Sequence, residues 1–240
     1  MKERIKAPFF EIGIKNYLYG DDVLSLACAA DKAAQEYDVD VLFITPYTEI
    51  RRVAEHTKRL IVLAPYMDLL KPGRGMADVL PEALAAAGAK GVVLNHCERP
   101  MTLSKIRQGI ERARQLELLS FVCADTIEEV KAVAQLCPDI INPEQTELIG
   151  TGKNSGMGYV EKSMQAVKNI NSSILVEQAA SISSPEQIYQ LILAGAEGVG
   201  VASGICTAKE PNILAMKMIE SVRRAEDTMK SKGKERIMEG

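Results

Sequence analysis

The chain has 240 residues, of which 47% are apolar and 25% are charged, and its formal net charge is −3. This composition excludes a disordered chain and favours one globular domain with a sizeable core. Acidic and basic residues are mixed throughout, so the sequence offers no basic stripe for nucleic acid, and no apolar run suits a membrane span or a signal segment. We therefore expect a cytoplasmic protein that binds neither nucleic acid nor membrane. The five cysteines form no C-x-x-C pair, which argues against a zinc site or a disulfide framework.

Short β-branched runs alternate with amphipathic stretches along the chain, a pattern typical of parallel β-α units. The predicted strands cover residues 9–14, 39–45, 60–64, 91–94, 118–123, 140–142, 173–177 and 198–202. The predicted helices cover residues 22–37, 49–56, 80–87, 103–116, 127–136, 159–169, 184–194 and 212–229. Strands that are each followed by a helix predict an α/β fold of the closed (β/α)8 barrel type, in one domain over residues 1–240.

A doubly wound open sheet is the competing architecture. Its dinucleotide fingerprint is missing, because the glycine-containing segment 150–155 lacks the third glycine of G-x-G-x-x-G. The connection over residues 65–79 is longer than a barrel loop requires, so we expect it to project and to serve subunit contact or substrate closure. The polar segment 230–240 is expected to fray.

Three polar residues follow predicted strands at the point where each strand ends. They are Lys15, His96 and Glu144, after the first, fourth and sixth strands. The reactive groups of a (β/α)8 barrel lie at the carboxyl ends of its strands, so barrel closure would bring these side chains together. Gly150 and Gly152 follow Glu144 closely and can expose backbone N–H groups to an anion. The pattern indicates a base beside a phosphate site.

Each of these residues also has an ordinary structural interpretation, and only their combination favours catalysis. Glu147, three residues after Glu144, is a rival for the base. Cys97 next to His96 might suggest a thiol nucleophile, but neighbouring residues on an extended strand point to opposite sides. We therefore do not expect a Cys-His pair to act.

Six short segments strengthen this interpretation. They are Ile14-Lys15-Asn16-Tyr17, Lys71-Pro72-Gly73, Val79-Leu80-Pro81-Glu82-Ala83, Leu94-Asn95-His96-Cys97-Glu98, Glu147-Leu148-Ile149-Gly150-Thr151-Gly152 and Val201-Ala202-Ser203-Gly204. In this order and spacing they resemble the triosephosphate isomerase family, in particular its shorter archaeal-type branch. The resemblance spans nearly the whole chain.

The resemblance implies the family's established mechanism. Glu144 would be the base that moves a proton between neighbouring carbons through an enediol, and Lys15 would supply a fixed positive charge held by Glu98. His96 would donate a hydrogen bond to the carbonyl oxygens as neutral imidazole, kept neutral by the positive end of a helix that starts near Pro100.

The resemblance also implies the ligand and the assembly. The substrate would be a small phosphorylated sugar, with dihydroxyacetone phosphate and glyceraldehyde 3-phosphate as the pair, and neither a metal nor a cofactor is needed. A lid over residues 147–156 would exclude water. A homodimer or a homotetramer is implied. The residues at the phosphate would be Gly150, Ser183, Ser203 and Gly204.

The chain departs from the family near the substrate. Gly13 stands where the family has an asparagine, residues 178–183 replace a glycine-rich pattern, and residues 145–146 replace a proline-containing hinge. Met76 and Ala77 replace a Thr-Gly pair. These changes leave two alternatives open: an isomerase of a four-carbon ketose phosphate such as erythrulose phosphate, and a non-catalytic barrel that binds sugar phosphates.

Overall fold

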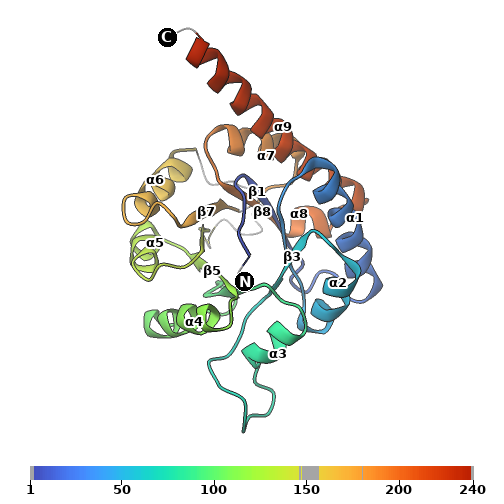
Figure 1. Ribbon diagram of the computed structural model, residues 1–240, viewed down its shortest axis with the longest axis vertical. Helices are drawn as coiled ribbons and strands as arrows, with labels where there is room; N and C mark the ends of the chain where they lie inside the picture. Colours follow the sequence, from blue (N-terminus) through green and yellow to red (C-terminus); the bar gives the residue numbers. More distant parts are fainter. Residues whose placement is uncertain (1–2, 146, 148–156, 180, 239–240) are drawn as a thin grey trace.

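In a computed structural model, which describes residues 3–145, 147, 157–179 and 181–238, eight parallel strands close into a barrel in chain order (Figure 1). The strands are β1 (Phe9–Gly13), β2 (Val41–Ile44), β3 (Leu60–Ala64), β4 (Gly91–Leu94), β5 (Leu119–Ala124), β6 (Ile140–Pro143), β7 (Leu175–Gln178) and β8 (Gly198–Val201). Each strand pairs with the next, and β8 pairs with β1. The predicted (β/α)8 fold is confirmed.

Helices surround the barrel (Figure 1). They are α1 (Asp21–Tyr37), the 3-10 turn η1 (Tyr47–Glu49), α2 (Ile50–His56), α3 (Pro81–Ala86), α4 (Leu103–Gln115), α5 (Ile127–Ala134), α6 (Met157–Lys168), α7 (Pro185–Leu193), α8 (Ser203–Cys206) and α9 (Pro211–Met238). Local capping sets several starts: the side chains of Thr102 and Thr126 accept backbone hydrogen bonds before α4 and α5, and Ser184 forms a capping box with Gln187.

The structure differs from the sequence prediction in two helices. The short helix α8 was not predicted, because four residues are too few to show a helical period. The expectation that the segment from Lys230 frays is wrong as far as Met238, where α9 ends. This segment contains no proline and is rich in lysine, glutamate, arginine and methionine, which favour helix. The loop over 65–79 does project, near α3 (Figure 1).

The core has two parts, because successive side chains of a strand point to opposite sides of the sheet. Phe10 and Ile12 of β1 face outward and pack in the apolar layer between the strands and the helices. Phe9 of β1 faces inward and packs with Leu42, Leu63 and other residues inside the barrel. The interior is therefore a packed core and not a pore.

Strand β8 has the sequence Gly-Val-Gly-Val, and its glycines face the interior. Val199 and Val201 belong to the outer apolar layer. A Cβ atom on Gly198 would overlap the ring of Phe9, its partner in the parallel ladder. The missing side chain is thus what lets Phe9 fill the centre of the barrel.

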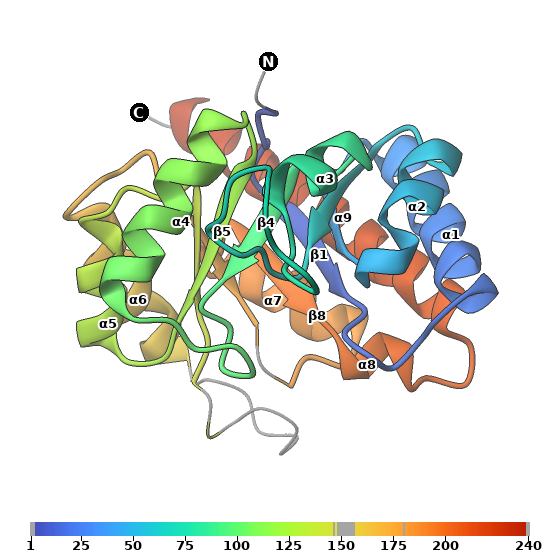
Figure 2. The same cartoon turned by 90° about the horizontal axis from the view of Figure 1, so that it is seen from below.

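The carboxyl ends of the strands form one end of the barrel. α8 follows the carboxyl end of β8 and lies at the lower edge of the view in Figure 2. Loops from several strands therefore meet at this edge, where barrel enzymes place their chemistry. Within the described part of the chain, no helix combines the length and the apolar character that crossing a membrane requires.

Candidate active site

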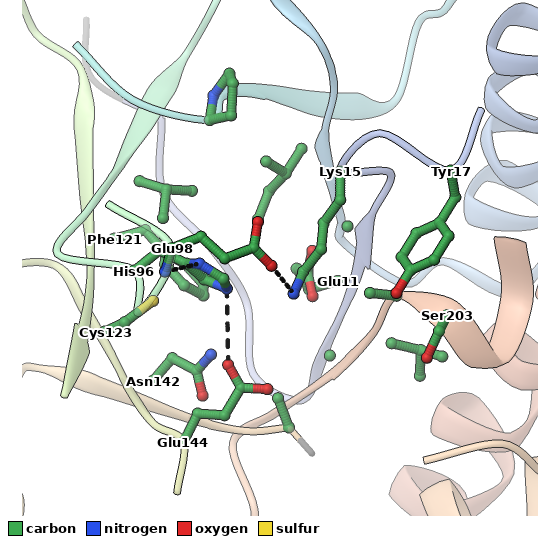
Figure 3. Close-up of a pocket in the computed structure, with 18 of the residues that line it drawn as sticks. Glu11, Lys15, Tyr17, His96, Glu98, Phe121, Cys123, Asn142, Glu144 and Ser203 are labelled. Carbon is green, nitrogen blue, oxygen red and sulfur yellow. Dashed lines mark hydrogen bonds and ion pairs between the residues drawn. The ribbon is translucent and has the colours of Figure 1, made fainter. Parts of the chain in front are cut away.

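A cavity of about 470 Å3 opens at the carboxyl end of the barrel. Lys15, His96 and Glu144 all line it, although they come from three different strand ends (Figure 3). Glu98 lines it too. Barrel closure therefore brings together the residues that the sequence singled out.

Lys15 follows β1 with a positive φ of 49°, a conformation that is costly for a residue with a side chain and that concentrates at functional sites. Its Nζ atom donates to Oε1 of Glu98 at 3.0 Å, the contact that the resemblance implied. Burial alone would lower the pKa of Lys15, but the hydrogen bond and the charge of Glu98, together with Glu144, raise it. Lys15 is therefore a permanent cation in the cavity.

His96 is held in place by its neighbour Asn95, whose backbone also has a positive φ, of 58°. The Nδ2 atom of Asn95 donates to the carbonyl oxygen of Cys123 at 2.9 Å, and Oδ1 accepts from the backbone N–H of Met101 at 2.8 Å. These two bonds tie the turn after β4 to β5 and to the segment before α4. The imidazole is thus presented to the cavity by a fixed turn.

The tautomer of His96 follows from its contacts. The backbone N–H of Glu98 donates to Nδ1 at 3.2 Å, so the proton of the neutral ring lies on Nε2. Burial and the charge of Lys15 lower the pKa of His96, although Glu98 opposes them. Nε2 is therefore a hydrogen-bond donor of an uncharged imidazole.

The predicted start of the helix after His96 was wrong. Pro100 does not start a helix: α4 begins at Leu103, where the side chain of Thr102 caps it. Burial and the charge of Lys15 lower the pKa of His96 in this arrangement. The expected separation of Cys97 from His96 was also wrong, since β4 ends at Leu94 and Sγ of Cys97 lies 3.8 Å from Nδ1 in the following turn. Burial nevertheless raises the pKa of this thiol, which disfavours a thiolate nucleophile.

Glu144 follows Pro143, the last residue of β6, and its backbone N–H donates to the carbonyl oxygen of Ala124 at 3.0 Å. Its Oε2 atom lies 4.0 Å from Nε2 of His96. Burial raises the pKa of Glu144, with Lys15 opposing and Glu98 adding to the shift. A carboxylate that is poorly solvated in this way is a stronger base than an exposed one.

Of the residues predicted at the phosphate, Ser203 and Gly204 line the cavity. A Cβ atom on Gly204 would overlap the backbone oxygen of Ile182, so the turn after β8 lies directly against the loop after β7. Ser183 is exposed and is not among the described residues that line the cavity, and its N–H donates to Oε1 of Gln187 at 2.9 Å. Gly150 lies outside the described residues, as does most of the predicted lid.

Sequence reasoning missed part of the cavity floor. Glu11 and Asn142 line the cavity from inside the barrel, and Glu177 is fully buried beside Glu11. Arg99 also lines the cavity, with its guanidinium 4.7 Å from the centre of the Tyr66 ring. The sequence did contain a signal for Glu11. It is a charged residue inside an apolar strand, and it lies two positions from Gly13, so both point to the same side of the sheet. Burying a charged side chain is costly, and such a residue therefore indicates a function.

Comparisons with known proteins agree with this geometry. A family model described as triosephosphate isomerase matches residues 12–222. The triosephosphate isomerase of Saccharolobus solfataricus is 35% identical over 225 residues, which cover 92% of this chain and 99% of that protein. The triosephosphate isomerase of Methanobacterium bryantii is 34% identical over 227 residues, which cover 92% and 100%. That of Methanocaldococcus jannaschii is 35% identical over 197 residues, which cover 81% and 90%. With its barrel, its strand-end residues and these matches, the chain belongs to the triosephosphate isomerase family.

Proposed function

We propose that the chain interconverts dihydroxyacetone phosphate and glyceraldehyde 3-phosphate, with Glu144 as the base. The carboxylate would take a proton from C1 of the ketose and return it to C2 of the enediol. The observation that carries this proposal is the placement of Glu144 and His96, with a base and a neutral donor 4.0 Å apart over one cavity. Proton transfer by a positioned carboxylate contributes about 10²- to 10⁴-fold to such a rate.

His96 would polarise the carbonyl oxygen and move the hydroxyl proton between O1 and O2. The hydrogen bond that Nδ1 accepts from Glu98 supports this role, because it leaves the Nε2–H free for the substrate. The low pKa of the ring, caused by burial and by Lys15, favours a neutral donor over an imidazolium.

Lys15 would stabilise the enediolate and the phosphate by its charge, without transferring a proton. Its ion pair with Glu98 holds the ammonium at the cavity wall (Figure 3). Ser203 and Gly204 would contact the phosphate, and we retain Gly150 as a further phosphate contact. None of the steps assigned to these residues requires a metal or a cofactor.

The decisive experiment compares Glu144→Gln with Glu147→Gln, since Glu147 is the rival for the base. Turnover of glyceraldehyde 3-phosphate should fall at least about a thousandfold in Glu144→Gln and only a few-fold in Glu147→Gln. In D2O the wild type should incorporate solvent deuterium next to the carbonyl. An equal loss in both variants, or an inactive wild type, would overturn the proposal.

The same assay with a four-carbon ketose phosphate tests the alternative substrate. Faster turnover of erythrulose phosphate than of triose phosphate would assign the longer sugar as the substrate. The cytoplasmic location and the homodimeric or homotetrameric assembly stay predictions from the sequence.

A further inference from the structure

Two glutamates are buried inside the barrel below the proposed catalytic residues. Glu11 of β1 is 6% exposed and Glu177 of β7 is 0% exposed. Within the described residues, Oε1 of Glu11 and both carboxyl oxygens of Glu177 have no hydrogen-bond partner, and neither does Oδ1 of Asn142. Buried polar atoms without partners are costly, so these groups call for a ligand or a protonated state.

Glu11 and Glu177 approach one another where β8 has no side chain. An ideal Cβ atom on Gly200 would lie 2.5 Å from Oε2 of Glu11 and 3.1 Å from Oε1 of Glu177. Two carboxyl groups buried this deeply beside one another do not both ionise, so at least one of them keeps its proton. Burial, followed by the charge of Glu144, raises the pKa of Glu11, which Lys15 only partly offsets.

A bound cation is the other way to balance such a pair. The described residues contain no group of three or more His, Cys, Asp or Glu side chains placed to hold a metal ion. Among the described groups that act on the pKa of Glu11, the cation is Lys15, and it offsets the raised pKa only in part. A pair that keeps at least one proton is therefore the state that these groups favour.

Glu11 also occupies the space that a side chain at position 13 would fill, where this chain has a glycine. An ideal Cβ atom on Gly13 would lie 3.0 Å from Oε1 of Glu11. Residues 11, 13 and 15 share one side of the chain, so the Glu11 carboxyl occupies the space below Lys15 into which a side chain at position 13 would project (Figure 3). This carboxyl group lines the same cavity as His96 and Glu144.

We propose that Glu11 is a catalytic residue whose neutral carboxyl group donates a hydrogen bond, from the cavity floor, to the substrate oxygen that becomes the enediolate. This inference rests on the proposed function and names a contact within the same site. Glu177 is a positioning residue: it is buried beside Glu11, its charge favours the protonated form of Glu11, and it is not among the described residues that line the cavity. An O–H donor in a site that excludes water stabilises developing negative charge without adding charge of its own.

Only the protonated form of Glu11 suits this role, since an ionised carboxyl would repel the enediolate. The groups that act on Glu11 from the surrounding elements are Lys15, Glu144, Glu177, Cys123 and Cys206. Of these, the two carboxyl groups and the two thiols favour a protonated Glu11 when charged, and Lys15 alone favours ionisation. Activity should therefore be lost as the pH rises through the raised pKa of Glu11.

The test compares Glu11→Gln with Glu11→Met in the full chain. The two replacements have similar length and both remove the buried acid, but only glutamine keeps an N–H donor. We expect kcat/KM to stay within about fivefold of wild type in Glu11→Gln and to fall about a hundredfold in Glu11→Met, mostly through kcat. The alkaline loss of activity should disappear in Glu11→Gln.

A rescue variant separates the contact from a structural effect. In Glu11→Ala/Gly13→Asn, the space cleared by the smaller residue 11 admits a short amide at position 13, and activity should recover relative to Glu11→Ala. Unchanged kcat/KM in Glu11→Met, or equal losses in Glu11→Met and Glu11→Gln while both variants keep the wild-type circular dichroism, would overturn the inference. If Glu144→Gln abolishes turnover and Glu11→Met does not, this inference fails alone; an inactive wild type would remove the proposed function first.

Discussion

The Nε2 atom of His96 and the Oε2 atom of Glu144 lie 4.0 Å apart, but the two groups do not form an ordinary ion pair. Burial lowers the pKa of His96 and raises the pKa of Glu144, so the site disfavours the charge on each. A neutral donor beside a poorly solvated base is the combination that proton abstraction next to a carbonyl requires.

The first prediction concerns the acid side of the pH profile. Glu144 acts as a carboxylate and its pKa is raised, so kcat/KM should fall as the pH drops through a value above that of an ordinary glutamate. Protonation of His96 contributes only below its usual value near 6.5. Steady-state kinetics across the acid range should show this limb both in wild type and in His96→Gln; its disappearance in His96→Gln would assign it to the imidazole instead.

The second prediction concerns the ion pair between Lys15 and Glu98. Glu98→Gln removes the charge that contributes most to raising the pKa of Lys15 and leaves Glu144 as the remaining carboxylate that opposes the effect of burial. We expect kcat/KM to fall about fivefold, in line with about 1 kcal/mol for an ion pair in which the Glu98 side chain is largely exposed. Glu111→Gln is the matched control, because Glu111 pairs with Arg107 on the exposed face of α4. Similar kinetics in both variants would contradict a role for the Lys15 pair.

The third prediction concerns Gly204. In Gly204→Ala the added Cβ atom meets the backbone oxygen of Ile182, which cannot rotate away as a side chain would. The turn after β8 must move from the loop after β7, so KM should rise about tenfold or more while the protein stays folded. Kinetics with triose phosphate and inhibition by inorganic phosphate measure the effect, and both should weaken together. Unchanged phosphate inhibition would place the phosphate elsewhere.

The fourth prediction concerns stability. Gly198→Ala should destabilise the fold by about 1 to 3 kcal/mol, because the new methyl group overlaps the Phe9 ring in a filled interior. Gly158→Ala is the matched control: position 158 lies in α6 with nothing within 4 Å of the added Cβ, so this change should be neutral or should stabilise by up to about 1 kcal/mol. Urea unfolding of both variants provides the comparison.

The barrel could be predicted because apolar residues recur with a different spacing in strands than in helices, and the two spacings alternate along the whole chain. Lys15, His96 and Glu144 could be found because each follows an apolar strand, and a closed barrel brings strand ends together. Element boundaries were less accurate: β7 begins at Leu175, two residues after the predicted start, because Asn171 binds the backbone and side chain of Ser173 in a turn.

Other features could not be read from the sequence because they depend on contacts between distant segments. Ser183 lies beside Gly204 of the turn after β8, 21 residues further along the chain, where an ideal Cβ on Gly204 would lie 3.1 Å from the Cα atom of Ser183. The pairing of Glu11 with Glu177 depends on two strands that sit on either side of β8 and on the missing side chain of Gly200. The order of residues in the sequence does not reveal how far apart the side chains of two separate strands lie.

The two inward glycines of β8 also determine how the barrel closes. The ladder between β1 and β8 pairs Phe9 with Gly198 and Glu11 with Gly200. A shift of two residues would keep every side chain on its side of the sheet, yet it would take the Phe9 ring away from Gly198, whose missing side chain makes room for it. The final seam of the sheet is thereby specified by complementary shape, and an aligned seam sets Lys15 at the height of His96 and Glu144.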